Sequence, residues 1–246
     1  MISQRSGRIL GEARVPPEWH ERGQFFFHPF RLRAVSLAPV RTFEVDRMQA
    51  GEEPAVIAAL ARAFHDDPLF GFFVPNLLKQ MKSLISFMTS GVKDARPFGD
   101  VWVAHNDGKV AGAAVWLPPG GYPRGVRRDL MTYVRTLPTF VHSGRRMPRA
   151  VGLLGAVDKA HHELKGPHYY LAILGTDPEF QRSGAGSAVL APVLERCDTL
   201  GLPAYLETQK EANVAYYARH RFELVQKIEH TGCPPICTLL REPKLG

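Results

Sequence analysis

Leu174-Gly175-Thr176-Asp177-Pro178-Glu179-Phe180-Gln181-Arg182-Ser183-Gly184-Ala185-Gly186 is the most informative stretch of this chain. It follows an aromatic and β-branched run, His168 to Leu174, that is typical of a buried strand. It leads into a helical pattern that extends from about Gly184 to Leu200. The first N–H groups of a helix have no intrahelical acceptor and carry partial positive charge. Since glycine lets an anion approach those N–H groups closely, the stretch predicts a phosphate-binding loop.

The glycine spacing excludes two common nucleotide-binding motifs. A dinucleotide-binding fold requires G-x-G-x-x-G after its first strand, and a P-loop requires G-x-x-x-x-G-K-[ST]. The stretch has neither, because Gly184 and Gly186 stand two apart and no Gly-Lys pair follows them. A tight turn before a helix also explains such a pair of glycines, so the surrounding sequence has to distinguish the two possibilities.

Outward from the loop, the hydrophobic patterns alternate between helix and strand periods. Further strands are expected at 42–45, 101–104, 110–117, 204–207, 223–228 and 237–240, with a hairpin turn at Asn106-Asp107-Gly108. Further helices are expected at 52–64, 77–87 and 212–219, and Pro68 is expected to stop the first of them. Residues 122–164 are expected to be a helical insert broken by Pro138 and Gly144, and Pro192 is expected to kink the helix after the loop.

The beginning of the chain differs from the rest. Residues 1–40 mix Arg, Pro and polar residues with the aromatic cluster Phe25-Phe26-Phe27 and Phe30, and they show no sustained period. Regular patterns begin at Arg41. We therefore expect an N-terminal extension, 1–40, followed by one domain, 41–246.

Two segments together resemble the GNAT superfamily of N-acetyltransferases. Gln181-x-x-Gly184-x-Gly186, after a strand that ends in Asp177-Pro178, resembles the acetyl-CoA loop of that superfamily. The stretch Asn213-Val214-Ala215-Tyr216-Tyr217-Ala218-Arg219-His220-Arg221-Phe222 resembles its Asn…Phe-Tyr-x-x-x-Gly-Phe segment. Leu206-Glu207-Thr208 and Asp66-Asp67-Pro68 add to the likeness. The resemblance follows the element order of residues 41–246, is specific over about 168–228, and is strongest to the puromycin-acetyltransferase-like branch.

The resemblance implies the fold and one local irregularity. The expected fold is α/β, in the mixed α+β sense: a GNAT acyl-CoA N-acyltransferase fold with a mixed, mostly antiparallel central sheet, flanking helices and a helical insert. Residues 41–246 would then be the N-acetyltransferase domain. Arg221 stands where the family has a glycine in a turn, so strained backbone is expected there.

The resemblance also assigns the cofactor-binding residues. Backbone groups of Leu174, Gly175 and Thr176 are expected to pair with the pantetheine arm of acetyl-CoA and to polarise the thioester carbonyl. Asn213 is expected to bond the pantetheine or to cap the following helix. Acetyl-CoA is the expected cosubstrate, and no metal is expected. The pyrophosphate is expected on the backbone N–H groups of Gln181, Arg182, Ser183, Gly184, Ala185, Gly186 and Ser187.

The catalytic groups are assigned with alternatives. Tyr217 is expected to be the general acid that protonates the leaving thiolate, or else a core aromatic residue. Glu207 is the first choice for the general base, or else a solvated carboxylate at a strand end. Asp66 and Asp67 either bind a cationic substrate or cap a turn before Pro68. The histidines His161, His162, His168 and His220 are expected to be surface or packing residues.

The expected function is transfer of an acetyl group from acetyl-CoA to a primary amine of a small molecule, by direct attack on the thioester. The alternatives are an acetyl-CoA-binding sensor or catalytically silent regulatory protein, and an acetyltransferase for protein lysines or N-termini. The formal net charge of +7 attracts anions. The phosphates of coenzyme A account for an affinity for anions as well as RNA would, so we expect no nucleic-acid partner. We expect either a monomer or a homodimer.

The remaining composition bears on compartment. Three cysteines in 246 residues are too few for a disulfide scaffold. Cys233 and Cys237 lack a second pair of ligands for zinc. No run reaches the 18 or so apolar residues of a membrane helix, and the first residues lack the apolar core of a secretory signal. We therefore expect a cytoplasmic protein with no membrane partner.

Overall fold

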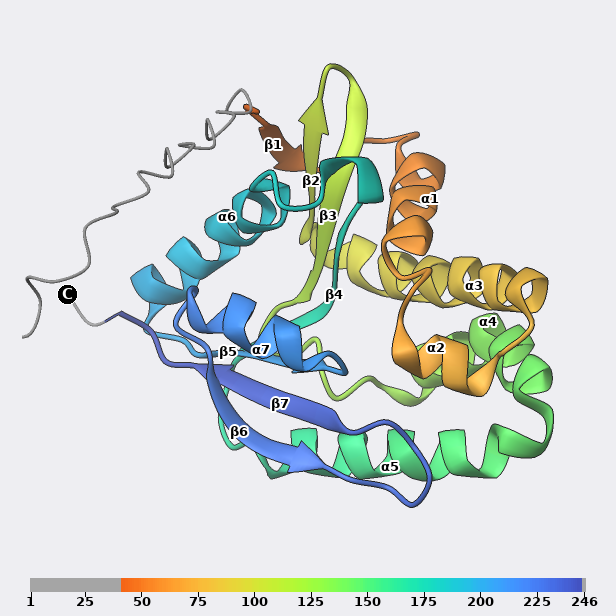
Figure 1. Ribbon diagram of the computed structural model, residues 1–246. Helices are drawn as coiled ribbons and strands as arrows, with labels where there is room; N and C mark the ends of the chain where they lie inside the picture. The colour runs from red at the N-terminus through yellow and green to blue at the C-terminus, as the bar shows by residue number, and fades with distance from the viewer. Residues whose placement is uncertain (1–40, 245–246) are drawn as a thin grey trace, which may run out of the picture. The chain divides into compact units, whose positions relative to one another are not determined.

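A computed structural model describes residues 41–244 of the chain (Figure 1). The expected extension, 1–40, lies outside the described residues. A single sheet of seven strands has the order β1-β2-β3-β4-β5-β7-β6. All neighbouring strands are antiparallel except β4 and β5, which are parallel. The strands are β1 (Glu44–Arg47), β2 (Val101–Asn106), β3 (Lys109–Leu117), β4 (Tyr169–Thr176), β5 (Ala204–Thr208), β6 (Glu223–Ile228) and β7 (Ile236–Arg241).

Helices cover both faces of this sheet. On one face α6 buries Val189, Leu190 and Val193 against β3 and β4. On the other face α1 and α3 bury Leu60 and Leu84 against β2, β3 and β4. The mixed, mostly antiparallel sheet with flanking helices is therefore confirmed. The helices are α1 (Glu53–Ala63), α2 (Pro68–Phe73), α3 (Leu77–Ala95), α4 (Val126–Ser143), α5 (Met147–Glu163), α6 (Ala185–Leu200) and α7 (Glu211–Ala218).

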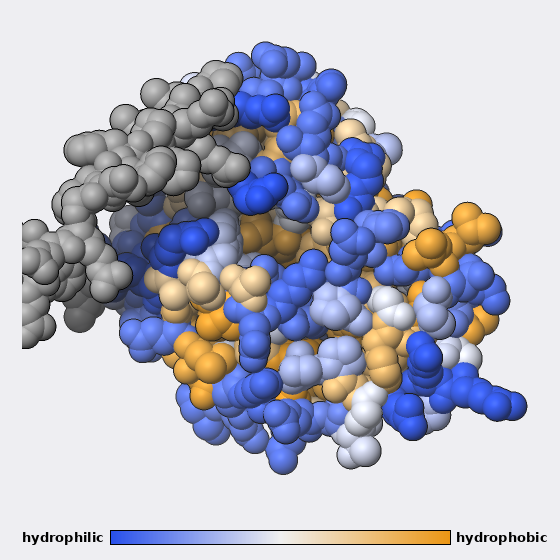
Figure 2. Space-filling model, in the orientation of Figure 1, coloured by the Kyte–Doolittle hydropathy of each residue, from blue (hydrophilic) through white to orange (hydrophobic). Residues whose placement is uncertain are grey.

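The predicted insert is present as two helices. In Figure 1, α4 lies beside α3, and α5 runs past β5, β6 and β7. The space-filling view in Figure 2 shows a mostly hydrophilic face, with apolar patches near the beginning of α3 and over the edge strand β6. Among the described residues, no helix has the length and hydropathy needed to cross a bilayer.

Two predictions that depend only on neighbouring residues agree with the structure. The turn between β2 and β3 has positive φ at Asp107 (50°) and Gly108 (73°), as a two-residue hairpin turn requires. Arg221 has φ 67°, so the strain expected at this position is present.

Two prolines behave differently from the sequence prediction. Pro68 does not simply stop a helix: α1 already ends at Ala63, and Pro68 is the first residue of α2, a helix the sequence did not predict. Proline suits that position because its missing N–H would have no acceptor there. Pro138 does not break α4. It is exposed, and so is Val134, the residue whose carbonyl loses its helical donor. That carbonyl can therefore bond to water, which lowers the cost of the proline.

Candidate active site

Strands β4 and β5 separate soon after they begin. They pair only from Tyr169↔Ala204 to Leu171↔Leu206, although β4 continues to Thr176. On its other side, β5 pairs with β7 from Ala204 to Thr208. The edge of β4 from Ala172 onward is therefore open on the side of β5. Such an edge can bind an extended molecule through its backbone groups.

A β-bulge decides which backbone groups face that open edge. Against β3, Ile173 pairs with Val115 and Leu171 with Trp116, so Ala172 is the extra residue. Asp177 N donates to the carbonyl of Ala111 at 2.9 Å. Because backbone groups alternate along a strand, Gly175 faces β3 whereas Leu174 and Thr176 face the opening.

This alternation leaves the backbone groups of Leu174 and Thr176, but not those of Gly175, free to pair with a bound molecule. The glycine at 175 has another reason: a Cβ there would lie 2.7 Å from Leu60 Cδ2 and 3.0 Å from Ala63 Cβ. Gly175 therefore allows α1 to pack directly on β4. Of the three predicted residues, Leu174 and Thr176 can offer backbone groups to the opening, and Gly175 cannot.

The loop after β4 delivers the beginning of α6 to the same place. Gly184, with φ +99°, precedes the helix. The first intrahelical bond runs from Ala188 N to Gly184 O at 3.0 Å, so the N–H groups of Ala185, Gly186 and Ser187 have no helical acceptor. A Cβ on Gly186 would lie 2.9 Å from Tyr216 Oη and 3.1 Å from Thr176 Oγ1. The helix start is thus held tightly against α7 and β4.

Side chains around the helix start form a polar layer. Gln181 Nε2 donates to the carbonyl of Thr176 at 3.4 Å. Ser187 Oγ lies 3.1 Å from His220 Nε2 and 3.5 Å from Tyr216 Oη. The loop segment 181–187 contains no acidic residue. In Figure 2 the surface is recessed close to where Figure 1 shows β4 between α6 and α7. This arrangement suits an anionic group at the helix start.

Tyr217 lies deeper than the loop residues. Its side chain belongs to the core beside α6, is 7% exposed, and packs edge-on against Phe222. Its hydroxyl has no hydrogen-bond partner among the side chains of residues 41–244. Burial raises the pKa of Tyr217, so the phenol stays protonated at neutral pH. A protonated hydroxyl without a partner suits a proton donor.

Glu207 is buried on the opposite face of β5. Its side chain is 10% exposed, and Oε1 lies 3.6 Å from Nδ1 of His161 on α5. Burial raises the pKa of Glu207 to about 7, although the hydroxyls of Tyr170 and Tyr205 and the charge of Arg124 lower it. The alternative of a solvated carboxylate is therefore wrong, because α5 covers this part of the sheet.

The sequence profile of the acetyltransferase (GNAT) family matches residues 66–222. This span covers the loop, Glu207 and Tyr217. The chain belongs to the GNAT family. In this GNAT protein the predicted loop lies at the junction of β4 and α6, where the first N–H groups of the helix have no helical acceptor.

Solved GNAT structures share the fold. A histone acetyltransferase HPA2-related acetyltransferase from Corynebacterium glutamicum has a TM-score of 0.58 at 19% identity, covering 83% of this chain and 98% of its own. A polyamine N-acetyltransferase of Drosophila melanogaster has a TM-score of 0.54 at 14% identity, covering 82% and 100%. Arylalkylamine N-acetyltransferase 2 of Aedes aegypti has a TM-score of 0.55 at 12% identity, covering 83% and 100%.

Hydrogen-bond directions in this GNAT protein constrain the tautomers of two histidines near Glu207. His168 Nδ1 faces the carbonyl of Gly166 at 3.0 Å, which can only accept, so Nδ1 carries hydrogen. In a neutral His168, Nε2 then accepts from His161 Nε2, 2.9 Å away. A neutral His161 is left with a bare Nδ1 facing Glu207. At 3.6 Å from Glu207 Oε1 this nitrogen is beyond hydrogen-bond distance, so it is burial that raises the pKa of the carboxyl.

Several members of this cluster were not predicted as functional residues. His161 and His168 were expected to be surface or packing residues, and Tyr170 and Tyr205 were expected only as parts of strands. The sequence held one usable signal: Tyr205 and Glu207 are two apart in a strand and so share one face. The histidines come from another element, α5, and from the residue before β4, and their contact depends on the tertiary fold.

Asn213 does not cap α7. The helix begins at Glu211, so Asn213 lies within its first turn, and its amide donates to Thr208 Oγ1 at 3.0 Å. This bond connects α7 to the end of β5. The helix-capping alternative for Asn213 is wrong, whereas the pantetheine contact stays a prediction.

Asp66 and Asp67 differ from each other. Asp67 is buried and caps α2, with Oδ1 accepting from Leu69 N at 2.9 Å and Phe70 N at 3.2 Å. Asp67 is thus a cap, but of the helix that begins at Pro68 and not of a turn before it. Asp66 is exposed and lies 2.9 Å from His65 Nδ1. The carboxylate of Asp67 is thus already engaged, and a substrate role for either residue remains a prediction.

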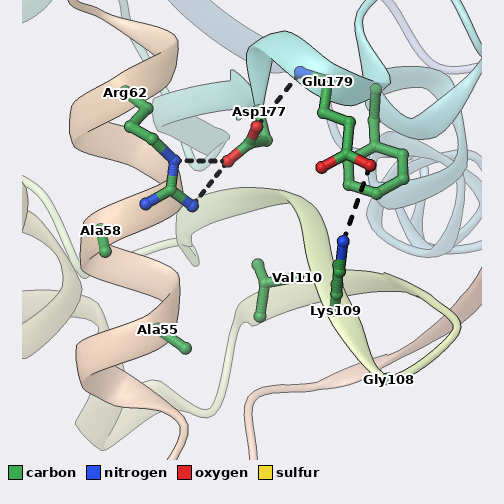
Figure 3. A pocket seen from close by; sticks show the side chains of 9 residues that line it. Ala55, Ala58, Arg62, Gly108, Lys109, Val110, Asp177 and Glu179 are labelled. Carbon is green, nitrogen blue, oxygen red and sulfur yellow. Dashed lines mark hydrogen bonds and ion pairs between the residues drawn. The ribbon is translucent and has the colours of Figure 1, made fainter.

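A cavity with paired charges lies elsewhere. It has a volume of about 490 Å³ and lies on the β3 side of β4, between α1 and the β2–β3 turn (Figure 3). Its charges are paired: Arg62 with Asp177 at 2.6 Å, and Lys109 with Glu179 at 3.7 Å. Since it lies on the other side of β4 from the opening, we do not assign it to the site. Within residues 41–244 no group of three or more His, Cys, Asp or Glu side chains is arranged to hold a metal ion.

Proposed function

We propose that this protein transfers an acetyl group from acetyl-CoA to a primary amine of a small molecule by direct attack on the thioester. One observation supports the proposal: β4 has an open edge beyond Leu171, and the start of α6, whose first N–H groups have no helical acceptor, packs against Thr176 at the end of that strand. An extended amide-bearing arm and a pyrophosphate are the two parts of coenzyme A that such a pair of features recognises.

The backbone of one continuous segment binds the cosubstrate in this proposal. The N–H groups from Gln181 to Ser187 hold the pyrophosphate at the helix start. The backbone of Leu174 and Thr176 pairs with the pantetheine amides, and Leu174 N–H polarises the thioester carbonyl. Asn213 supports the far wall of the opening from α7. These groups need no side-chain charge, which explains why the loop can be small and glycine-rich.

Two buried side chains manage the protons. The amine nitrogen attacks the carbonyl carbon, the carbon–sulfur bond breaks, and the products are an amide and the free thiol of coenzyme A. Glu207 accepts the proton that the amine loses, and its pKa of about 7 is suited to a base at neutral pH. The Tyr217 hydroxyl donates a proton to the departing thiolate.

A small acceptor is favoured over a protein. The insert helix α5 covers the face of the sheet on which Glu207 lies, and α4 packs beside α3, which leaves little room for a folded partner. Solved relatives of the same fold include proteins described as agmatine, polyamine and arylalkylamine N-acetyltransferases. Their described acceptors are small amines, which supports the same class here.

A catalytically silent acetyl-CoA-binding protein is the second candidate. Two observations favour it: Arg221 holds a strained φ of 67° next to Phe222, and Tyr217 is almost fully buried. If burial keeps the Tyr217 hydroxyl out of reach of the thiolate, the protein binds cosubstrate without turning it over.

The test begins with a calorimetric titration of the full chain with acetyl-CoA, followed by a thiol-release assay with a panel of amines. Micromolar binding, roughly 8 kcal/mol, with turnover of at least one amine supports the enzyme. Binding without turnover over the panel supports the silent protein. No binding at all contradicts both.

A further inference from the structure

A second, smaller cavity lies directly beside the β4 bulge. It has a volume of about 70 Å³ and is enclosed by α3, α4, Arg124 and the β4 residues Tyr170, Ala172 and Ile173. At about 30 Å³ per water molecule, this is room for roughly two waters, or for one functional group of a ligand. Tyr170 also faces Glu207, whose pKa its hydroxyl lowers, so the cavity and the candidate base share one wall.

Two hydroxyl groups that line this cavity have no partner. Ser90 Oγ of α3 and Thr132 Oγ1 of α4 are buried, and neither makes a hydrogen bond within the described residues. Ser90 is only 3% exposed. An unsatisfied buried hydroxyl costs about 1–3 kcal/mol, so two of them in one cavity indicate that something polar belongs there.

The charge of the cavity is positive. None of its lining residues carries a carboxylate, and one of them is Arg124. Arg124 Nε donates to Asp94 Oδ2 at 2.7 Å, and Arg128 Nε donates to Asp94 Oδ1 at 2.8 Å. One carboxylate thus neutralises only one of two guanidinium groups. Within residues 41–244 the Nη1 and Nη2 atoms of Arg124 have no hydrogen-bond acceptor.

We propose that this cavity binds a carboxylate of the acceptor, so that the preferred substrates are amines that also carry a carboxylate, such as amino acids. A carboxylate matches the forked guanidinium of Arg124 and accepts from both orphan hydroxyls. A polyamine would place a cation beside Arg124 and leave those hydroxyls unsatisfied. This inference rests on the proposed function, because it names the acceptor class of the same site.

The first test compares amines of one skeleton in the thiol-release assay. The pairs are phenylalanine with 2-phenylethylamine, and lysine with cadaverine, and phenylalanine methyl ester controls for size without charge. The expected result is a kcat/KM at least about tenfold higher for each carboxylate-bearing member. Equal or higher kcat/KM for the decarboxylated members and the ester, with normal acetyl-CoA binding, overturns the inference and leaves the proposed function standing.

Two variants connect that preference to the cavity. Arg124→Gln is expected to abolish the preference for the carboxylate, mainly by raising KM, while Asp94 keeps its bond to Arg128. Arg128→Gln is the matched control, because Arg128 bonds the same carboxylate but does not line the cavity. Equal loss in both variants would show that the effect comes from the Asp94 cluster, and would contradict a contact with substrate.

A third variant separates binding from structural support. Ser90→Ala removes an unsatisfied hydroxyl, so the unliganded protein is expected to keep or raise its Tm while KM for phenylalanine increases. A lower Tm with unchanged KM would mean that Ser90 has only a structural role. If no amine is turned over, calorimetric titration with phenylalanine and with 2-phenylethylamine still decides. Binding of phenylalanine that Arg124→Gln abolishes supports the site, and no binding of phenylalanine overturns it.

Discussion

Glu207 Oε1 lies 3.6 Å from Nδ1 of His161, across the packing of α5 on β5, and both side chains are buried. Burial lowers the pKa of His161 to about 3 and raises that of Glu207 to about 7. Both groups of the pair are therefore neutral between about pH 3 and about pH 7. A base of this kind becomes available only as the pH approaches neutrality.

Glu207→Gln is expected to remove the acidic limb of the pH profile. In the wild type, kcat/KM should rise with pH and level off above an apparent pKa near 7, as Glu207 loses its proton. The variant should show a flat profile and a rate lower by about 10²–10⁴-fold. Glu211→Gln is the control, because Glu211 is exposed on α7. If kcat/KM of Glu207→Gln still falls at acidic pH as in the wild type, the general base is another residue.

The same carboxyl makes stability depend on pH. The folded pKa of Glu207, about 7, lies above its ordinary value of 4.5, so its favourable contribution is complete below pH 4.5 and disappears as the pH rises through 7. Glu207→Gln does not titrate. Its free energy of unfolding relative to wild type should therefore be higher at pH 8 than at pH 5, measured by urea unfolding. A difference independent of pH would contradict a buried, proton-bearing Glu207.

Gly186→Ala is expected to weaken acetyl-CoA binding by about tenfold or more. The new Cβ would lie 2.9 Å from Tyr216 Oη and 3.1 Å from Thr176 Oγ1, so these side chains or the start of α6 have to shift, which disturbs the loop. The control is Gly155→Ala in α5, where a Cβ meets nothing within 4 Å. Calorimetric titration of both variants measures the effect. Unchanged affinity in Gly186→Ala would mean that the loop does not hold the cosubstrate.

Arg221→Gly is expected to stabilise the protein by about 0.5–1 kcal/mol. Arg221 has φ 67°, a conformation that costs a residue with a Cβ about 1–2 kcal/mol, and the greater freedom of glycine in the unfolded chain offsets part of this gain. Arg219→Gly, at φ −64°, should not stabilise. Urea unfolding compares the two. If Arg221→Gly also raises turnover, the strained turn limits the catalytic geometry around Tyr217.

The sequence alone determined the features whose physics is local. The loop between β4 and α6 lies in one continuous segment, 174–187, so its glycine spacing and the change from strand to helix could be predicted directly. The same applies to the hairpin at Asp107 and Gly108 and to the strained Arg221, because a turn depends on its own few residues. The family follows from these signals together, as the match over 66–222 confirms.

Tertiary structure decided what depends on segments far apart in the chain. Glu207 became a buried group with a raised pKa only because α5 covers it, and no local pattern reports that loss of water. The bulge at Ala172, which exposes Leu174 and Thr176 instead of Gly175, depends on the register with β3. The small cavity exists because Ser90, Thr132 and Arg124 converge from three elements. The loss of water around a side chain and the direction in which a backbone group points both depend on packing, so they are decided only when the chain is folded.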